Sequence, residues 1–246
     1  MTQRGLFRFS LLWLVVLLLA GLVGCAAPSG SDPRDPFESY NRSVTRFNDN
    51  LDEAVLKPVA QTYVQVTPSP VRTGVKKFFG NLGDVWSTLN NAMQLKPKET
   101  VESLARVLVN TVVGIYGLFD VATELNLTRH AEDFGQTLGY WGVPSGPYLV
   151  LPVLGPSTLR DTASLSIDTQ GNLVRQIDHV PTRNTLWLTG AVDKRSRFLD
   201  ASDQVDALAL DKYIFLRDVF LQKRLSDVWD GNPPEAPEET EEPKPE

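Results

Sequence analysis

Residues 134–156 read FGQTLGYWGVPSGPYLVLPVLGP. The segment is apolar and aromatic enough for a membrane, yet it contains five glycines and four prolines. Proline removes a helical hydrogen-bond donor and clashes with the preceding turn, so this segment cannot be a regular membrane-spanning helix. We therefore expect an irregular loop or a short hairpin here.

The chain before this segment is patterned for amphipathic helices. Apolar residues recur at spacings of three and four, as on one face of a helix, in two stretches. They are Phe37, Tyr40, Val44, Phe47 and Leu51 in the first stretch, and Val71, Val75, Phe78, Phe79, Leu82, Val85, Trp86, Leu89 and Met93 in the second. Asp35 and Pro36 fit an N-cap and a first-turn proline, with Glu38 at the third helical position. The second helix is expected to bend near Gly80 or Gly83.

Further helices are expected elsewhere. Lys57-Pro58 begins a short helix that ends near Thr67-Pro68, and Pro97 begins the next one. Residues 186–199 and 202–229 read as two more helices. The sequence thus predicts a mainly α fold, with residues 134–156 as its possible β content.

Residues 107–121 (VLVNTVVGIYGLFDV) are apolar almost all round. The stretch is shorter than the roughly 20 residues that span a bilayer. It is therefore either a buried core helix or an element embedded in one leaflet.

The N-terminus predicts export and lipidation. Arg4 and Arg8 precede an apolar run, residues 11–24, that stops at Cys25, the only cysteine. A basic region before a short apolar run is typical of a secretory signal, and the run is short for the alternative, a transmembrane anchor. Residues 22–25 (LVGC) resemble a bacterial lipobox, which makes Cys25 the acylated residue. Ala26 follows in place of the aspartate that commonly retains lipoproteins at the inner membrane, which favours the outer membrane.

These signals divide the chain into four parts. Residues 1–24 are the signal peptide, residues 25–35 a lipidated linker, residues 36–229 a helical domain and residues 230–246 an acidic, proline-rich tail that we expect to be disordered. The net charge of the chain is -6, and the tail, with seven acids and one lysine, contributes all of it. The rest is nearly neutral, which argues against a nucleic-acid partner, since binding nucleic acid needs a basic face.

The sequence offers little catalytic or metal-binding chemistry, so we expect no enzyme activity and no cofactor. It has two histidines, His130 and His179, and no cysteine after Cys25, which removes a Cys/His metal site. It has neither a GxSxG elbow nor a Walker-type loop. Glu132-Asp133 is expected to cap a helix or lie in a solvated turn, and Arg160-Asp161 to form a structural ion pair. A Ser–His–Asp triad that uses either histidine stays open, because triads assemble in space.

Several stretches together resemble the MlaA (VacJ) family of outer-membrane lipoproteins. They cover about residues 33–225, in the family's order behind a lipobox. The matching positions are Asp35, Pro36, Glu38, Asn41 and Arg42 with Phe47 and Asn48; residues 114–120 (GIYGLFD); Phe134, Gly135 and Gly139 with Gly146, Pro147, Arg160 and Asp161; and Asp211, Tyr213, Arg217 and Gln222. Lys212 departs from the family, which often has proline there, and the segment around Thr45-Arg46 is less rich in Asn and Phe.

The resemblance implies a ring-like arrangement of amphipathic helices in the inner leaflet of the outer membrane, on its periplasmic side. An amphipathic channel through the ring would pass phospholipids that have strayed into the outer leaflet to a soluble periplasmic lipid carrier. It also implies association with a trimeric porin. An esterase and a scaffolding lipoprotein are the alternatives.

The resemblance also suggests a place for residues 134–156. Irregular backbone is tolerated at membrane depth only where it packs on protein or lines a wet cavity. Trp141, Tyr148, Leu149 and Leu151 are therefore candidates for apolar surface beside the lipid path. The alternative is an ordinary loop that only packs the core.

Overall fold

The computed structural model describes residues 32–234, so Cys25 and most of the predicted acidic tail lie outside the described residues. The helices are α2 (Glu38–Leu51), α3 (Lys57–Val66), α4 (Ser69–Met93), α5 (Pro97–Val112), α6 (Val121–Glu124), α7 (Phe134–Tyr140), α8 (Leu159–Gly171), α9 (Val180–Ser196), α10 (Leu199–Leu208) and α11 (Lys212–Val228). A π-helical segment (Asp52–Leu56) joins α2 to α3, and a 3-10 turn (Leu173–Gln176) follows α8. The strands β1 (Tyr148–Leu151) and β2 (Gly155–Thr158) form an antiparallel hairpin.

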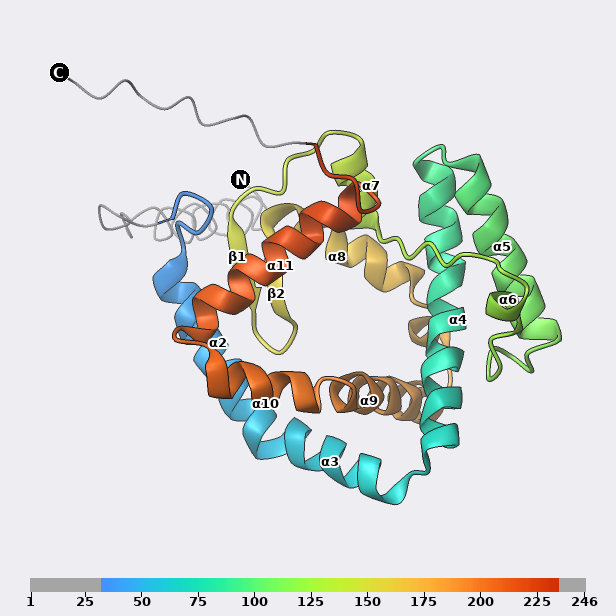
Figure 1. Ribbon diagram of the computed structural model, residues 1–246, viewed down its shortest axis with the longest axis horizontal. Coiled ribbons are helices and arrows are strands. Elements are labelled where there is room, and N and C mark those ends of the chain that lie inside the picture. The colour runs from blue at the N-terminus through green and yellow to red at the C-terminus, as the bar shows by residue number, and fades with distance from the viewer. Residues whose placement is uncertain (1–31, 235–246) are drawn as a thin grey trace, which may run out of the picture.

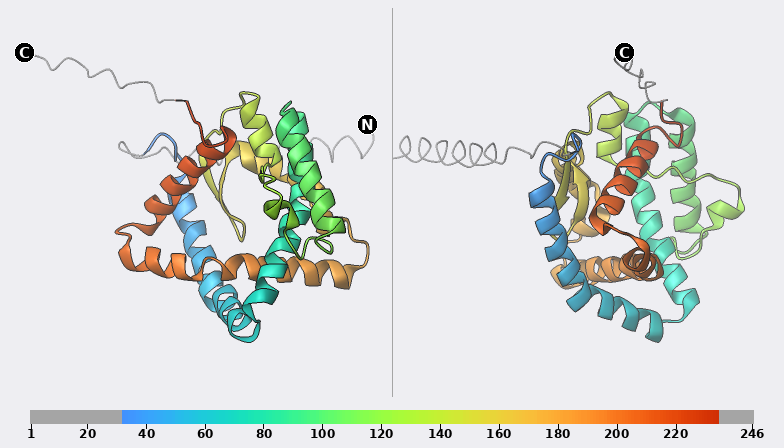
Figure 2. Two further views of the ribbon diagram at one scale, coloured as in Figure 1. Left: turned by 45° about the vertical axis from the view of Figure 1, so that its right-hand side comes forward. Right: turned by 60° about the vertical axis from the view of Figure 1, so that its left-hand side comes forward.

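The helices form a ring, as predicted. Figure 1 shows α2 on one side and α4 on the opposite side, with α10, α9 and below them α3 along the bottom, and α11 and α8 along the top. The opening remains visible after a 45° turn (Figure 2). The α5–α6 pair packs on the outer side of α4 (Figure 1). The hairpin lies between α2 and α11 beside the opening. The segment 134–156 is therefore only partly the expected short hairpin, because its first residues form α7.

Local sequence explains several of the helix boundaries. Pro58 lacks an N–H group, and the α-helical ladder is interrupted just before it by the π-helical segment, where the Lys57 N–H bonds to the Asp52 carbonyl. Pro97 begins α5 as predicted. The helix α4 runs without interruption through Gly80 and Gly83.

The structure corrects the prediction that Asp35 caps the first helix. That helix begins at Glu38, and its N-cap residue, Phe37, makes no side-chain capping bond. The Asp35 carboxylate is instead fully buried, where it accepts hydrogen bonds from Asn41 and Tyr213. The linker predicted over residues 25–35 therefore ends earlier, because Asp35 is already part of the domain.

Two helix predictions near the C-terminus are also corrected. The helix predicted over residues 186–199 begins earlier, at Val180, where the His179 imidazole accepts a hydrogen bond from the Thr182 N–H. The single helix predicted over residues 202–229 is broken into α10 and α11. The break occurs because Asp211 caps the Ile214 N–H and pairs with Arg42 on α2, 2.8 Å away.

The tail begins with a contact that its composition does not suggest. Asp230 forms an ion pair with Lys96, which also lies 3.3 Å from Glu132. The first residue of the predicted disordered tail is therefore bound to the domain.

The α4–α5 pair packs polar side chains inward. Asn81, Asp84 and Ser87 on α4 and Ser103, Arg106 and Asn110 on α5 are all buried. Asn81 donates to Thr111 over 3.0 Å, and Arg106 pairs with Asp120 over 3.0 Å. The opposite face of α5 exposes a stripe of Val101, Leu104, Leu108 and Val112 at helical spacing. This arrangement is the reverse of the usual apolar-in pattern of a surface helix.

The apolar stripe continues past the end of α5. The helix ends at Val112, and residues 113–119 turn back with left-handed backbone at Ile115 and Tyr116. Val112 is 77% and Tyr116 72% exposed. The proposal of a buried core helix over residues 107–121 is therefore wrong. No helix in residues 32–234 is both long and apolar enough to cross a bilayer.

Candidate functional site

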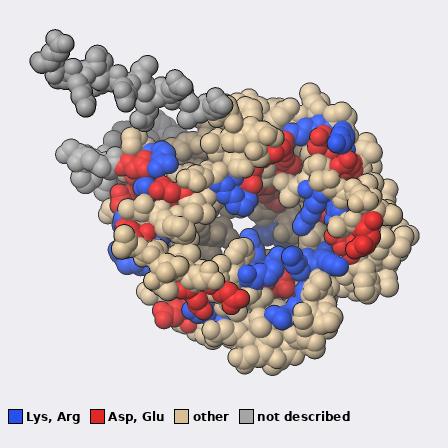
Figure 3. Space-filling model, in the orientation of Figure 1, with Lys and Arg blue, Asp and Glu red and all other residues tan. Residues whose placement is uncertain are grey.

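The centre of the ring is hollow. Figure 3 shows the hollow with Lys and Arg side chains gathered around it. A cavity of about 630 Å³ occupies the side of the ring where α4 and α9 approach each other, and α8 and residues 129–136 complete its wall. We call it the ring cavity.

One part of the ring cavity is apolar. Leu82 and Trp86 line it from α4, Leu186 and Trp187 from α9, and Leu173 from the 3-10 turn. The Trp86 indole N–H donates to Asp168 over 2.8 Å, which fixes the ring against Gly171. A Cβ atom at Gly171 would lie 2.2 Å from the indole, so only glycine fits there.

The other part of the ring cavity is charged. Arg129, Lys194 and Arg197 supply positive charge, and Glu132, Asp133 and Asp168 supply carboxylates. A cavity with both apolar and charged walls suits an amphipathic ligand.

Glu132 is buried in this wall. Gln94 donates to its carboxylate over 2.9 Å, and Lys96 lies 3.3 Å away. Burial raises the pKa of the Glu132 carboxyl to about 7, against the pull of Gln94 and Lys96. Glu132 is therefore not in a solvated turn, whereas Asp133 caps α7 through the Gln136 N–H as predicted.

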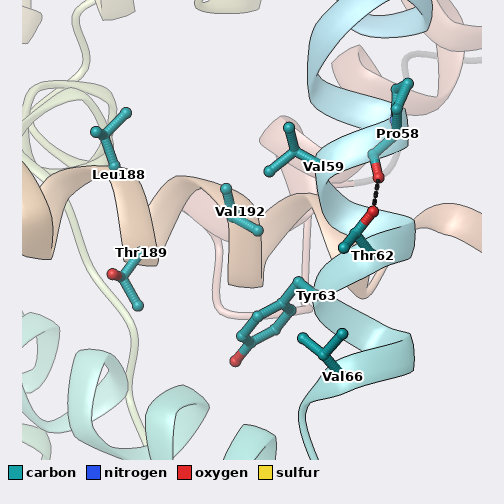
Figure 4. Close-up of a pocket in the computed structure, with 8 residues that line it drawn as sticks. All are labelled: Pro58, Val59, Thr62, Tyr63, Val66, Leu188, Thr189 and Val192. Carbon is teal, nitrogen blue, oxygen red and sulfur yellow. Dashed lines mark hydrogen bonds between the residues drawn. The ribbon is translucent and has the colours of Figure 1, made fainter.

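A second, apolar groove of about 530 Å³ lies on the other face of α9 (Figure 4). Val59 and Val66 line it from α3, and Leu188 and Val192 from α9. Tyr63 beside them donates its hydroxyl to Asp193 over 3.2 Å. The helix α9 thus faces a cavity on each side, with apolar residues such as Trp187 on one face and Leu188 on the other. Its apolar residues therefore do not form a single stripe.

An ionic cluster beside the hairpin joins α7, α8 and α11. Arg224 contacts Asp133 over 2.6 Å and Asp161 over 2.8 Å, and Arg160 pairs with Asp161 over 3.0 Å, as predicted. Burial would raise the pKa of the Asp133 carboxyl, but the Arg224 contacts outweigh it and lower that pKa. The cluster fixes α11 to the start of the hairpin segment.

Two of the family-motif residues, Asn41 and Asn48, hold the hairpin in place. Asn41 accepts from the Val150 N–H and donates to the Tyr148 carbonyl, and Asn48 bonds in the same way to Val153 and Leu151. The other motif residues take the following positions. Arg42 lies over the Tyr213 ring, Arg217 contacts Asp35, Gly146 has left-handed backbone, and Pro147 accepts from the Leu159 N–H. Gly135 packs against Arg224, and Gly139 packs against Arg160. The Phe134 N–H donates a hydrogen bond to Asp168, and Glu38 forms an ion pair with Arg42. Pro36 precedes α2, and Phe47 is exposed.

The four lipid-path candidates fall in different places. Trp141 is 64% exposed in the loop after α7. Tyr148, at 1% exposure, packs with Val150 and Tyr213 in the apolar core, so it does not present the surface expected of it. Leu149 and Leu151 lie half-buried on the opposite face of β1.

The sequence did not predict the cationic residues of the ring cavity, Arg129, Lys194 and Arg197. Trp187, Lys194 and Arg197 share a helical spacing that could have placed them on one face of α9. Arg129 has no such signal, because it lies in an irregular segment and reaches α4 only through the tertiary fold.

The structure gives no support to a histidine-based triad. The His130 imidazole contacts Glu102 over 2.7 Å, and the His179 imidazole contacts Thr182 over 2.8 Å. In residues 32–234 no three His, Cys, Asp or Glu side chains gather as a metal site would require.

Comparison with known proteins gives one consistent result. The family model described as MlaA lipoprotein matches residues 33–227. The lipoprotein MlaA of the intermembrane phospholipid transport system of Escherichia coli (strain K12) is 34% identical over 209 residues, which cover 82% of each chain. A protein of Rickettsia bellii is 34% identical over 195 residues, 79% of this chain and 76% of that one. A solved structure, described as "Structural basis for maintenance of bacterial outer membrane lipid asymmetry", matches with a TM-score of 0.69 at 31% identity, over 80% of this chain and 99% of that one.

Proposed function

This chain belongs to the MlaA lipoprotein family, and we propose that it removes mislocalised phospholipids from the outer leaflet of the outer membrane and passes them to a periplasmic lipid carrier. Such transfer would maintain the lipid asymmetry of that membrane. It needs a path with polar groups for the headgroup and apolar groups for the acyl chains.

The α4–α5 pair is the observation that supports this proposal most directly. Its polar side chains face each other, while Val101, Leu104, Leu108 and Val112 face outward. In water this arrangement would expose a large contiguous apolar surface, which marks a membrane or protein contact. We place this stripe, with the exposed apolar turn at residues 113–119, among the acyl chains of one leaflet.

The ring cavity supplies the other requirement. Its wall has apolar groups such as Trp86 and Trp187 and charged groups such as Lys194. Moving a lipid along such a wall breaks no covalent bond, so the proposed role needs no catalytic residue. An esterase would instead require a nucleophile and a base within hydrogen-bond reach.

The anchor places the ring at the membrane. We propose that Cys25 is acylated and holds the protein on the periplasmic side of the outer membrane, with a trimeric porin as neighbour. Two or more acyl chains are enough for stable anchoring, since each buried CH₂ contributes about 0.8 kcal/mol. Cys25→Ser should leave an uncleaved, mislocalised precursor. Normal fractionation and full activity of that variant would contradict this assignment.

The test of the function is the amount of phospholipid exposed on the cell surface. A strain that lacks the protein should expose more phospholipid than the wild type, and the intact gene should reverse the change. Normal outer-leaflet composition in the deletion strain would favour a scaffolding role. Turnover of a chromogenic ester by the purified protein, lost on changing one serine or histidine, would favour an esterase.

A further inference from the structure

The ring cavity has a division of chemistry along α9. Leu186 and Trp187 line it near the middle of the helix, and Lys194 and Arg197 line it near the C-terminal end. At 1.5 Å per residue, Trp187 and Lys194 are about 10 Å apart along the axis. Gly190 lies between them and lets α9 approach α4, since a Cβ there would lie 3.1 Å from the Phe79 ring. The wall thus changes from apolar to cationic over the length of one lipid headgroup and glycerol.

Arg129 adds a third cation from a different part of the chain. Its Nε donates to Asp84 over 2.6 Å and its Nη2 to the Gly80 carbonyl over 3.0 Å. The guanidinium lies against Gly80 and Gly83, where a Cβ atom would come within 3.4 Å and 3.9 Å of it. Among the described residues its Nη1 has no hydrogen-bond partner, and the side chain is 47% exposed. The protein therefore holds the Arg129 guanidinium through Nε and Nη2, and the N–H groups of Nη1 are left to bind a ligand.

The two cations of α9, Lys194 and Arg197, also have N–H donors without a partner among the described residues. Arg197 lies 3.4 Å from Asp193, which is buried and accepts from Tyr63 as well. Lys194 forms no ion pair or hydrogen bond with any of residues 32–234. Because Lys194 and Arg197 are three positions apart on one helix, their side chains are neighbours.

The carboxylates of the ring cavity, in contrast, are engaged within the protein. Asp133 is bound by Arg224, and Asp168 accepts from the Trp86 indole and the Phe134 N–H. Glu132 is bound by Gln94 and Lys96. The unsatisfied donors of this wall are therefore cationic, and the ligand that they fit is an anion.

We propose that Arg129, Lys194 and Arg197 form a site in the ring cavity for the phosphodiester of a phospholipid, with its glycerol and upper acyl chains against Trp86, Leu186 and Trp187. The inference rests on the proposed function and deepens it by naming the group of the lipid that is recognised. Guanidinium and ammonium groups form charge-assisted hydrogen bonds with phosphate oxygens, and these bonds are stronger than neutral ones.

The test compares two fluorescent lipids with the same labelled acyl chain, a phosphatidylglycerol and a diacylglycerol that lacks the phosphate. The purified lipoprotein in detergent micelles is titrated with each. Lys194→Gln with Arg197→Gln should weaken phosphatidylglycerol binding at least about tenfold, as expected for losing charged hydrogen bonds, and leave diacylglycerol binding unchanged.

Three further variants sharpen the result. Lys98→Gln removes an exposed lysine outside the ring cavity and should change neither titration. Lys194→Arg keeps the cation and should retain binding. Arg129→Gln should also weaken phosphatidylglycerol binding selectively. Because it leaves buried Asp84 without one partner, its melting temperature is measured alongside, and the α9 variants decide the matter if it fails to fold.

The possible outcomes separate the site from the function. One outcome is that the wild type binds both lipids while the α9 variants lose affinity for both equally, or for neither. That result would overturn the phosphate site and leave the proposed function standing. If the wild type bound neither lipid, the proposed function would fail and the site with it. Displacement of the labelled phosphatidylglycerol by inorganic phosphate, as effective as by unlabelled phosphatidylglycerol, would mean that the ligand is free phosphate and would overturn the lipid assignment.

Discussion

The Tyr213 hydroxyl donates a hydrogen bond to the Asp35 carboxylate, across 178 positions of the chain. Asp35 precedes α2, and Tyr213 is in the first turn of α11, so this bond joins the two ends of the ring. Asn41 also donates to Asp35 over 2.8 Å, and Arg217 approaches within 3.4 Å. Burial and the Asp35 carboxylate both raise the pKa of the Tyr213 hydroxyl, which keeps it protonated as the donor.

Tyr213→Phe should lower the free energy of unfolding by about 1–3 kcal/mol, because a buried carboxylate loses one donor while the ring packing is kept. Urea denaturation measures the change. Tyr140→Phe is the matched control, since Tyr140 is exposed and its hydroxyl has no hydrogen bond among the described residues. Equal effects of the two substitutions would show that the Asp35 contact is unimportant for stability.

Gly135→Ala should destabilise the domain by about 1–3 kcal/mol through overpacking. A Cβ atom at this position would lie 2.5 Å from Arg224 Nη2 and 2.5 Å from Asp161 Oδ1, so the ionic cluster would have to separate. Gly83→Ala is the control, because its Cβ would meet its nearest neighbour only at 3.9 Å and alanine favours a helix. It should leave the melting temperature unchanged or raise it. The prediction is wrong if Gly135→Ala melts like the wild type.

The stability of the domain should depend on the protonation of Glu132. Burial raises the pKa of this carboxyl to about 7 from 4.5, so the folded state binds more protons than the unfolded state between these values. The stability that Glu132 contributes is therefore complete below pH 4.5 and is lost as the pH rises through 7. Its charged neighbours are Lys96, which lowers this pKa, and Asp230, whose negative charge and hydrogen bond raise it.

Glu132→Gln, which does not titrate, should flatten the fall of stability with pH in that window. Denaturant titrations at several pH values measure the slope. Glu102→Gln serves as the control, since its hydrogen bond with His130 lowers the pKa of Glu102 and gives it the opposite pH dependence. An unchanged slope in Glu132→Gln would contradict the assignment.

Substitutions in β1 should separate the core from the lipid path. Val150 is 2% exposed in the core cluster, whereas Leu149 is half-buried on the other face of the strand. Val150→Asp should unfold the domain, because an unpaired buried charge costs several kcal/mol against a total stability of roughly 5–15. Leu149→Asp should fold, reach the outer membrane and impair lipid export, measured as surface-exposed phospholipid. A stable Leu149→Asp variant with undiminished export would remove the hairpin from the mechanism.

Local signals in the sequence were sufficient for most helices. The proline at Pro97 and the three- and four-residue spacing around Phe37 depend only on near neighbours, so they could be interpreted without a fold. The same holds for the glycines and prolines of residues 141–156, which exclude a regular helix there, whereas Phe134–Tyr140 form the short helix α7 that was not predicted. The family motifs identified the chain for a related reason, since their order along the sequence is preserved.

Only the tertiary structure decided which polar residues are inside. Asp35 has the sequence context of a helix cap, but Tyr213 and Arg217 of the distant helix α11, together with the nearby Asn41, hold its carboxylate in the core. Tyr148 and Leu149 were both expected beside the lipid path, but side chains alternate along a strand, and α2 and α11 cover the face that carries Tyr148. Likewise Arg129 and Lys194 are 65 positions apart in the sequence, and they line one cavity only because the helices close into a ring. Sequence spacing fixes contacts within one turn or one strand pair, whereas burial and the convergence of charges depend on how distant segments pack.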